Sequence, residues 1–113
     1  MTKVSVFEAV QQAIAEEMRR DPTVVAFGEG VATKYHQLTQ EFGLRVRNTP
    51  LAEGIIAGTA AGAAATGLRP IIDLLFMPFM AYSMEELINS AAKLRYISGG
   101  QFSFPLVAMK DRA

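Results

Sequence analysis

The chain has 113 residues, with 11 basic and 11 acidic side chains and therefore a formal net charge of zero at pH 7. This balance argues against nucleic acid or an anionic membrane surface as a main partner, because both attract a basic protein surface. The absence of cysteine excludes disulfides, zinc–thiolate sites, iron–sulfur clusters and thiol catalysis, and a single histidine excludes sites with several histidine ligands. Half of the residues are apolar, enough for the core of one domain over 1–113.

The first residues and the apolar middle of the chain bear on its compartment. Residues 1–8 lack the basic start and apolar run of a secretory signal, so we expect a cytoplasmic protein. Residues 54–82 are very apolar, but Arg69, Pro70 and Asp73 interrupt them. No uncharged run reaches the roughly 18 residues that a transmembrane helix needs, so we expect no membrane span.

The first elements have clear boundary signals. Residues 5–8, Ser-Val-Phe-Glu, form a capping-box pattern that predicts a helix start, and Asp21-Pro22 predicts its end. Residues 24–27 form a short apolar run before Gly28-Glu29-Gly30 and predict a buried, parallel strand. The core face of the helix is predicted from apolar residues at helical spacing: Phe7, Val10, Ile14 and Met18.

The middle of the chain is more mixed. Residues 31–43 predict one short helix ending at a glycine, residues 44–46 a brief strand, and residues 48–50 a turn. Residues 53–66 are rich in alanine and glycine and predict a helix that Gly67 closes.

The last third continues the alternation. Residues 71–76 predict an apolar strand that Pro78 breaks. Residues 83–86 repeat the capping-box pattern before a helix that Ser98-Gly99-Gly100 ends. Residues 104–109 predict a third strand. Strands that alternate with helices in this way indicate an α/β fold, a largely parallel sheet flanked by helices.

Glu53 is the acidic residue of most interest. It occupies the first turn of a predicted helix, next to apolar Leu51, Ile55 and Ile56. One interpretation is a carboxylate favoured by the helix dipole. The other is a carboxylate partly shielded from water, which is a strong hydrogen-bond partner for a ligand.

Three glycines of the same helix, Gly54, Gly58 and Gly62, are spaced four residues apart and form one ridge. Glycine in a helix costs about 1 kcal/mol relative to alanine, so this ridge indicates a need for close approach. Two interpretations stand side by side: packing in the core of the chain, or a subunit interface that makes a homo-oligomer.

Other patterns carry weaker signals. Gly28-Glu29-Gly30 follows a strand, but Thr33 stands where a dinucleotide fingerprint needs its third glycine, and no phosphate-binding loop is present. These glycines are typical of a strand-to-helix turn with unusual dihedrals. His36 has no second ligand or nucleophile near it in the sequence and is expected to play no catalytic role.

Two long stretches resemble a known family. They are Thr49-Pro50-Leu51-Ala52-Glu53-Gly54-Ile55-Ile56 with the small-residue run that continues to Arg69-Pro70, and the helix segment 89–100. They resemble the pyrimidine-binding domain of thiamine-diphosphate enzymes. The nearest resemblance is to the beta subunits of 2-oxoacid dehydrogenases, the decarboxylating component of pyruvate, branched-chain and acetoin dehydrogenase complexes.

The resemblance implies a set of site residues. The family's glutamate, which hydrogen-bonds N1′ of the cofactor's pyrimidine and promotes its activation, corresponds to Glu53. Phe79 corresponds to an aromatic ring against the pyrimidine face, and Leu51 to a pocket wall. Leu75 stands where several relatives have glutamine, so a polar contact there is absent from this chain.

The resemblance also implies partners. An alpha-type subunit would hold the diphosphate and its magnesium, a lipoyl acyltransferase would accept the acyl group, and no metal ligand is assigned to this chain. Family members continue well beyond 113 residues, so residues 1–113 correspond to a C-terminally incomplete pyrimidine-binding domain, and we expect the isolated chain to be inactive. The resemblance leaves open the 2-oxoacid and any potassium site.

Two alternatives remain at this stage. One is a non-catalytic truncated paralogue or fragment that acts as an oligomerising structural domain. The other, weaker because a phosphate loop is absent, is a nucleotide-binding α/β module.

Overall fold

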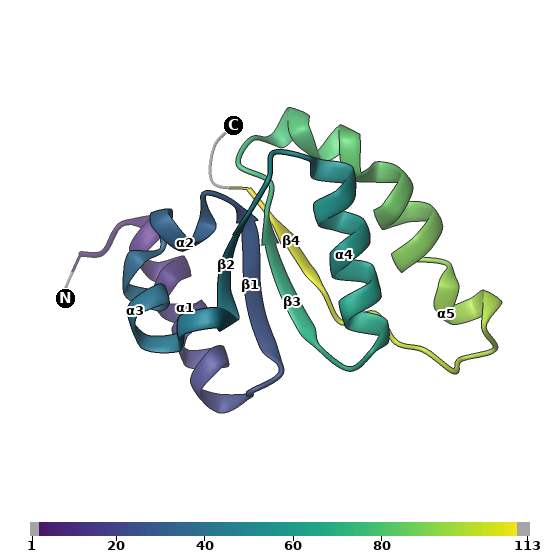
Figure 1. The fold of residues 1–113 in the computed structure, drawn as a ribbon, viewed down its shortest axis with the longest axis horizontal. Helices are drawn as coiled ribbons and strands as arrows, with labels where there is room; N and C mark the ends of the chain where they lie inside the picture. Colours follow the sequence, from purple (N-terminus) through teal and green to yellow (C-terminus); the bar gives the residue numbers. More distant parts are fainter. Residues whose placement is uncertain (1–2, 111–113) are drawn as a thin grey trace.

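The computed structural model describes residues 3–110, which form a sheet of four parallel strands (Figure 1). The strands are β1 (Val24–Glu29), β2 (Val46–Thr49), β3 (Arg69–Asp73) and β4 (Val107–Met109), and their order across the sheet is β2-β1-β3-β4. Every neighbouring pair is parallel. The predicted α/β class and parallel sheet are therefore confirmed.

Helices cover both faces of the sheet (Figure 1). On one face lie α1 (Val6–Arg20), α2 (Val31–Lys34) and α3 (His36–Phe42). On the other lies α4 (Glu53–Ala65), which packs on β3 and on two irregular helices, the 3-10 helix η2 (Met77–Ser83) and the π-helix η3 (Glu85–Ala91). Helix α5 (Leu94–Ile97) follows η3. Within residues 3–110, no helix is long and apolar enough to cross a membrane.

Each face of the sheet has its own apolar core. The core under α1 and α3 is built mainly on β1 and β2, and it contains Ile14, Met18, Val24, Ala26, Val31, Tyr35, Leu38 and Val46. The core under α4 contains Phe27, Ile56, Ala57, Ala60, Ile72 and Leu74. Neighbouring residues of β1 thus serve opposite cores, as expected for a strand covered on both faces.

The capping box at the start of α1 is confirmed. The Ser5 hydroxyl accepts a hydrogen bond from the Glu8 amide at 3.2 Å, and the Glu8 carboxylate accepts one from the Ser5 amide at 2.8 Å. Hydrogen bonds from the Ser5 amide and hydroxyl hold the pKa of Glu8 below its ordinary value. The predicted core face is only half right, because Ile14 and Met18 are buried while Phe7 and Val10 are partly exposed.

The segment between β1 and β2 differs from the prediction. Residues 31–43 do not form one helix, because Tyr35 has a non-helical conformation that separates α2 from α3, and its side chain is buried in the core instead. Residues 43–45 form a 3-10 turn rather than a strand. The strand begins at Val46 and includes Asn48 and Thr49, predicted as a turn, because Gly28 and Glu29 of β1 pair with them.

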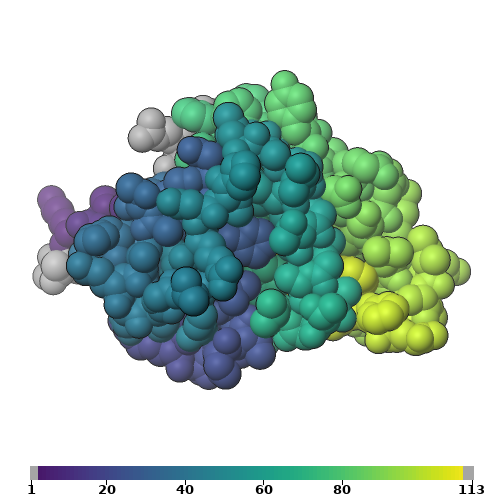
Figure 2. All heavy atoms as spheres, in the orientation of Figure 1, coloured from purple at the N-terminus to yellow at the C-terminus, as the bar shows by residue number. Residues whose placement is uncertain are grey.

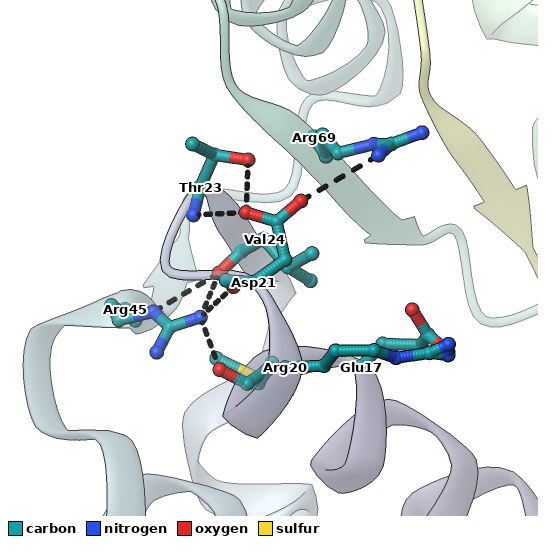
Figure 3. Close-up of polar contacts among 8 residues, drawn as sticks. Glu17, Arg20, Asp21, Thr23, Val24, Arg45 and Arg69 are labelled. Carbon is teal, nitrogen blue, oxygen red and sulfur yellow. Dashed lines mark hydrogen bonds and ion pairs between the residues drawn. The ribbon is translucent and has the colours of Figure 1, made fainter.

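Arg45 joins the end of α1 to the sheet (Figure 3). Its Nη2 donates hydrogen bonds to the carbonyl oxygens of Met18, Asp21 and Val24, each at 2.8 Å, and its Nε donates to Val24 at 3.1 Å. A helix C-terminus leaves carbonyls without partners inside the helix, and a guanidinium fork can satisfy several at once. Arg45 therefore fixes the turn from which β1 starts.

The second predicted capping box, at residues 83–86, is wrong. Ser83 is the last residue of η2 and is fully buried, and its hydroxyl donates to the carbonyl oxygen of Glu53 at 3.0 Å. No side chain caps the helix that follows, which has π geometry over Glu85–Ala91 and is separate from α5. The hydroxyl that was predicted to start a helix instead ties η2 to α4.

Two strand predictions were too long. β3 ends at Asp73, so the predicted residues 74–76 leave the sheet before Pro78, where Leu75 takes a left-handed backbone conformation. β4 begins at Val107 rather than at residue 104. Compared with the predictions, β3 is thus shorter at its carboxyl end and β4 at its amino end.

We predict that Arg45→Ala lowers the free energy of unfolding by about 2 kcal/mol, since four charge-assisted hydrogen bonds to carbonyls are lost. Urea denaturation of the purified chain measures the change. Arg47→Ala is the control, because Arg47 is exposed and within residues 3–110 its side chain donates one hydrogen bond, to the Leu44 carbonyl. Equal losses in both variants would contradict the assigned role.

We predict that the capping box makes stability depend on acid pH. The folded-state pKa of Glu8 is lowered from 4.5, so its stabilisation is present above that pH and is lost as the pH falls through the lowered value. Glu8→Gln keeps a capping partner without the charge. The stability difference between wild type and this variant should therefore shrink between pH 6 and pH 3 in denaturant titrations; a difference that stays constant would refute the assignment.

Candidate active site

The predicted site residues lie after the carboxyl ends of the strands. Leu51 and Glu53 follow β2, and Leu75 and Phe79 follow β3. In this strand order, the connection from β1 leads to β2 on one side and the connection from β3 leads to β4 on the other, so the strand order reverses between β1 and β3. Ligands of open parallel sheets generally bind near such a switch point.

Glu53 is the first residue of α4. Its side chain is half-buried, and within residues 3–110 the carboxylate has neither a hydrogen-bond nor an ion-pair partner. Its backbone is fixed, because its carbonyl oxygen accepts the Ser83 hydroxyl. The helix dipole favours a negative charge here, and the carboxylate is also free to bind a ligand.

Phe79 lies on the element that packs against the start of α4. It belongs to η2, is half-buried, and meets Phe76 edge-to-face with ring centroids 5.3 Å apart. Gly54 favours close contact between the two elements, since a Cβ there would lie 3.3 Å from the Tyr82 carbonyl oxygen, closer than ordinary van der Waals contact. The fold thus brings the elements of Glu53 and Phe79 together.

The two leucines occupy different settings. Leu51 is 65% exposed in the segment between β2 and α4. Leu75 is half-buried just after β3, with φ at 64°, and its amide donates to the Asp73 carboxylate at 2.8 Å. Leu75 therefore has a defined backbone position after β3, whereas Leu51 is largely exposed.

The glycine ridge of α4 divides into two parts. Gly54 contacts η2, and a Cβ at Gly58 would lie 3.3 Å from the Glu86 side chain, so both pack within the chain. A Cβ at Gly62 would meet nothing within 4 Å. Gly62 lines an apolar groove of about 360 Å³ whose walls are α4 and the segments around η3 and α5. Figure 2 shows the teal surface of α4 adjoining the green surface of these later segments.

Gly30 has the role expected of it in a strand-to-helix turn, whereas Gly28 lies within β1 and has a different role. A Cβ on Gly28 would lie 2.6 Å from the Asp73 carbonyl oxygen, so only glycine lets β1 approach β3 this closely. Gly30 has φ at 66° and is the N-cap of α2, which agrees with a strand-to-helix turn. The part of the chain that the structure describes contains no group of three His, Asp or Glu residues suited to a metal ion.

Sequence reasoning missed two residues that shape this region. Ser83 carries a capping pattern that pointed elsewhere, and nothing in its neighbourhood indicates a partner 30 residues away. Asp73 is 1% exposed and bonded to Lys34 and Tyr35, which lie 39 and 38 residues earlier. The one signal in the sequence for Asp73 was its position as an acidic residue at the end of an apolar strand.

The sequence pattern of a known family, described as "Transketolase, pyrimidine binding domain", matches residues 2–112. The chain belongs to this family. Its fold class, a parallel sheet between helices, agrees with that membership.

Relatives of this pyrimidine-binding domain are similar along nearly the whole chain. The beta-3 subunit of the chloroplastic pyruvate dehydrogenase E1 component of Oryza sativa subsp. japonica is 44% identical over 114 residues, covering 93% of this chain and 29% of the relative. The pyruvate dehydrogenase E1 beta subunit of Rhizobium meliloti is 46% identical over 114 residues, covering 95% of this chain and 25% of the relative.

A third relative has a different named activity. The beta subunit of acetoin:2,6-dichlorophenolindophenol oxidoreductase of Cupriavidus necator is 38% identical over 121 residues, covering 93% of this chain and 36% of the relative. The chain thus spans between a quarter and about a third of the length of these relatives.

We predict opposite effects for alanine at two positions of the glycine ridge. Gly62→Ala should raise the free energy of unfolding by about 0.5–1 kcal/mol, since alanine favours the helix and space is open. Gly54→Ala should give no gain, because its Cβ would press on the Tyr82 carbonyl. Denaturant titration measures both, and a gain at Gly54 equal to that at Gly62 would contradict the packing described.

Proposed function

We propose that this chain is the pyrimidine-binding half-site of a thiamine-diphosphate-dependent 2-oxoacid dehydrogenase component, active together with an alpha-type partner. One observation carries the proposal. Glu53 presents a half-buried carboxylate, without a partner among residues 3–110, at the start of α4 in a chain of this family.

The residues present fit an aminopyrimidine. A carboxyl group can hydrogen-bond a ring nitrogen, and Glu53 has that capacity unused within the described chain. The Phe76–Phe79 pair on the adjoining η2 supplies aromatic surface of the kind that packs on a planar ring. Leu51 and Leu75 add apolar surface at the same edge of the sheet.

When bound, thiamine diphosphate supplies the electron sink for cleaving the bond between the carbonyl carbon and the carboxylate of a 2-oxoacid. The contribution of this chain is position and polarity. Glu53 holds a proton between its carboxylate oxygen and pyrimidine N1′, and Ser83 keeps its backbone in place. Phe79 orients the ring, and the leucines limit the access of water.

Partners complete the proposed enzyme. An alpha-type subunit holds the diphosphate and magnesium, and a lipoyl acyltransferase takes the acyl group. Support comes from relatives named as the beta subunit of a pyruvate dehydrogenase E1 component, a name that implies further subunits. The groove beside Gly62 supports a homo-oligomer through α4, because its walls are apolar and its floor carries small residues.

The second candidate is a non-catalytic oligomerising domain. The same groove favours it, since Ala61, Gly62 and Ala65 are small residues that would let a partner helix approach closely. Calorimetry with thiamine diphosphate and magnesium separates the two functions. Heat of binding in the assembly of this chain with an alpha-type subunit supports the enzyme, whereas absence of binding there supports the structural domain.

We predict that Glu53→Gln lowers decarboxylation by the assembled enzyme by roughly 100-fold or more, since a positioned proton-transfer group is lost. Assembly should be unchanged. Steady-state rates with 2-oxoacids and light scattering measure the two properties. Glu16→Gln is the control, because Glu16 lies on the exposed face of α1. Wild-type activity in Glu53→Gln would refute the role of Glu53.

A further inference from the structure

Asp73 is a buried acid outside the set of residues assigned to the cofactor. It ends β3, its exposed fraction is 1%, and Ser83 is the one other polar residue buried to this degree among residues 3–110. A carboxylate withdrawn from water is costly unless charges and hydrogen-bond donors surround it. The contacts of Asp73 therefore show what the fold uses it for.

The two oxygens of Asp73 have separate partners. Oδ2 accepts hydrogen bonds from Lys34 Nζ at 2.5 Å and from the Tyr35 hydroxyl at 3.1 Å. Lys34 lies over the rings of Tyr35 and Phe7, which stack with centroids 5.2 Å apart. Oδ1 accepts a hydrogen bond from the Leu75 amide at 2.8 Å. One oxygen thus anchors Asp73 to the segment after β1, and the other fixes the backbone after β3.

The backbone that Oδ1 fixes is strained. Leu75 has φ at 64°, and among residues 3–110 it alone combines a side chain with a positive φ. For a residue with a Cβ, the left-handed conformation is disfavoured and persists only where the surroundings determine it. An acceptor two residues earlier, as in an Asx turn, is such a determinant.

The strained residue directs the chain into the candidate site. After Leu75 the backbone closes a tight turn, in which the Phe76 amide donates to the Leu74 carbonyl at 2.8 Å, and η2 begins at Met77. η2 carries Phe79 and ends at Ser83, which bonds Glu53. The orientation of η2 therefore depends on the conformation at Leu75.

We propose that Asp73 is a positioning residue for the cofactor site: through its bond to the Leu75 amide, it holds the left-handed turn that sets η2 and Phe79 against the start of α4. This rests on the proposed function. Lys34 and Tyr35 hold the carboxylate in the orientation that directs Oδ1 at that amide.

The test uses two double variants that both remove the buried ion pair. In Asp73→Asn with Lys34→Met, the amide oxygen can still accept the Leu75 N–H. In Asp73→Ala with Lys34→Met, no acceptor remains. Both double variants lose the Asp73 charge and the Lys34 ammonium group. A difference in cofactor affinity between the two variants therefore measures the effect of the hydrogen bond to the Leu75 amide.

Two measurements compare these variants. Calorimetry gives the affinity of the enzyme, assembled with its alpha-type partner, for thiamine diphosphate with magnesium. Hydrogen exchange gives the protection of amides 74–79 without cofactor. We expect the Asn variant to bind within about threefold of wild type and the Ala variant at least tenfold more weakly, with faster exchange over 74–79.

A third substitution separates positioning from general destabilisation. Glycine adopts a positive φ without the Cβ penalty, so in a Leu75→Gly background the affinity difference between the two double variants should shrink to within about threefold. If the loss of Asp73 only destabilised the fold in general, the affinity difference between the two double variants would persist in the Leu75→Gly background.

The outcomes are distinct. Equal affinities for the two double variants, or a difference that Leu75→Gly leaves unchanged, would overturn the role of Asp73 while the proposed function stands. A wild-type assembly that does not bind thiamine diphosphate would overturn the proposed function, and the positioning role with it.

Discussion

The close approach of β1 and β3 at their carboxyl ends determines much of this structure. Gly28 pairs with Asp73, and any side chain at residue 28 would lie within 2.6 Å of the Asp73 carbonyl oxygen. Because the strands pair to this point, the Asp73 carboxylate is withdrawn from water and lies within reach of Lys34 and Tyr35, which follow β1. A missing side chain in one strand thus defines the environment of an acid in the next.

From that point, short-range contacts lead to the candidate site. Asp73 fixes Leu75, the turn at Leu75 leads into η2, and Ser83 at the end of η2 fixes the backbone of Glu53. Gly54 lets the two elements touch. Each contact is local or bridges two adjacent elements, so the position of Glu53 depends on the sheet as much as on its own helix.

The comparison of the two capping-box patterns shows what the sequence could predict. At Ser5 and Glu8 both partners are local and exposed, so the pattern and the structure agree. At Ser83 the same pattern fails, because a carbonyl 30 residues away takes the hydroxyl. The parallel sheet, α1 and α4 followed from periodicity and boundary residues. The break at Tyr35 did not, since burial of its ring in the core overrides the local helical preference.

The difference between local partners and partners far away in the sequence also decides which site residues could be predicted. Glu53 could be singled out because a helix start and a family resemblance both fall on it, whereas Asp73 could not, because its partners are 38 and 39 residues away. The structure then separates the two acids by their contacts. Asp73 is buried with a full set of donors, so its charge is already used within the fold. Glu53 is half-buried and lacks a partner within residues 3–110, and it keeps the capacity to bond a ligand. In a domain with one histidine and no cysteine, that difference is the reason for proposing ligand binding by Glu53 and support of the site by Asp73.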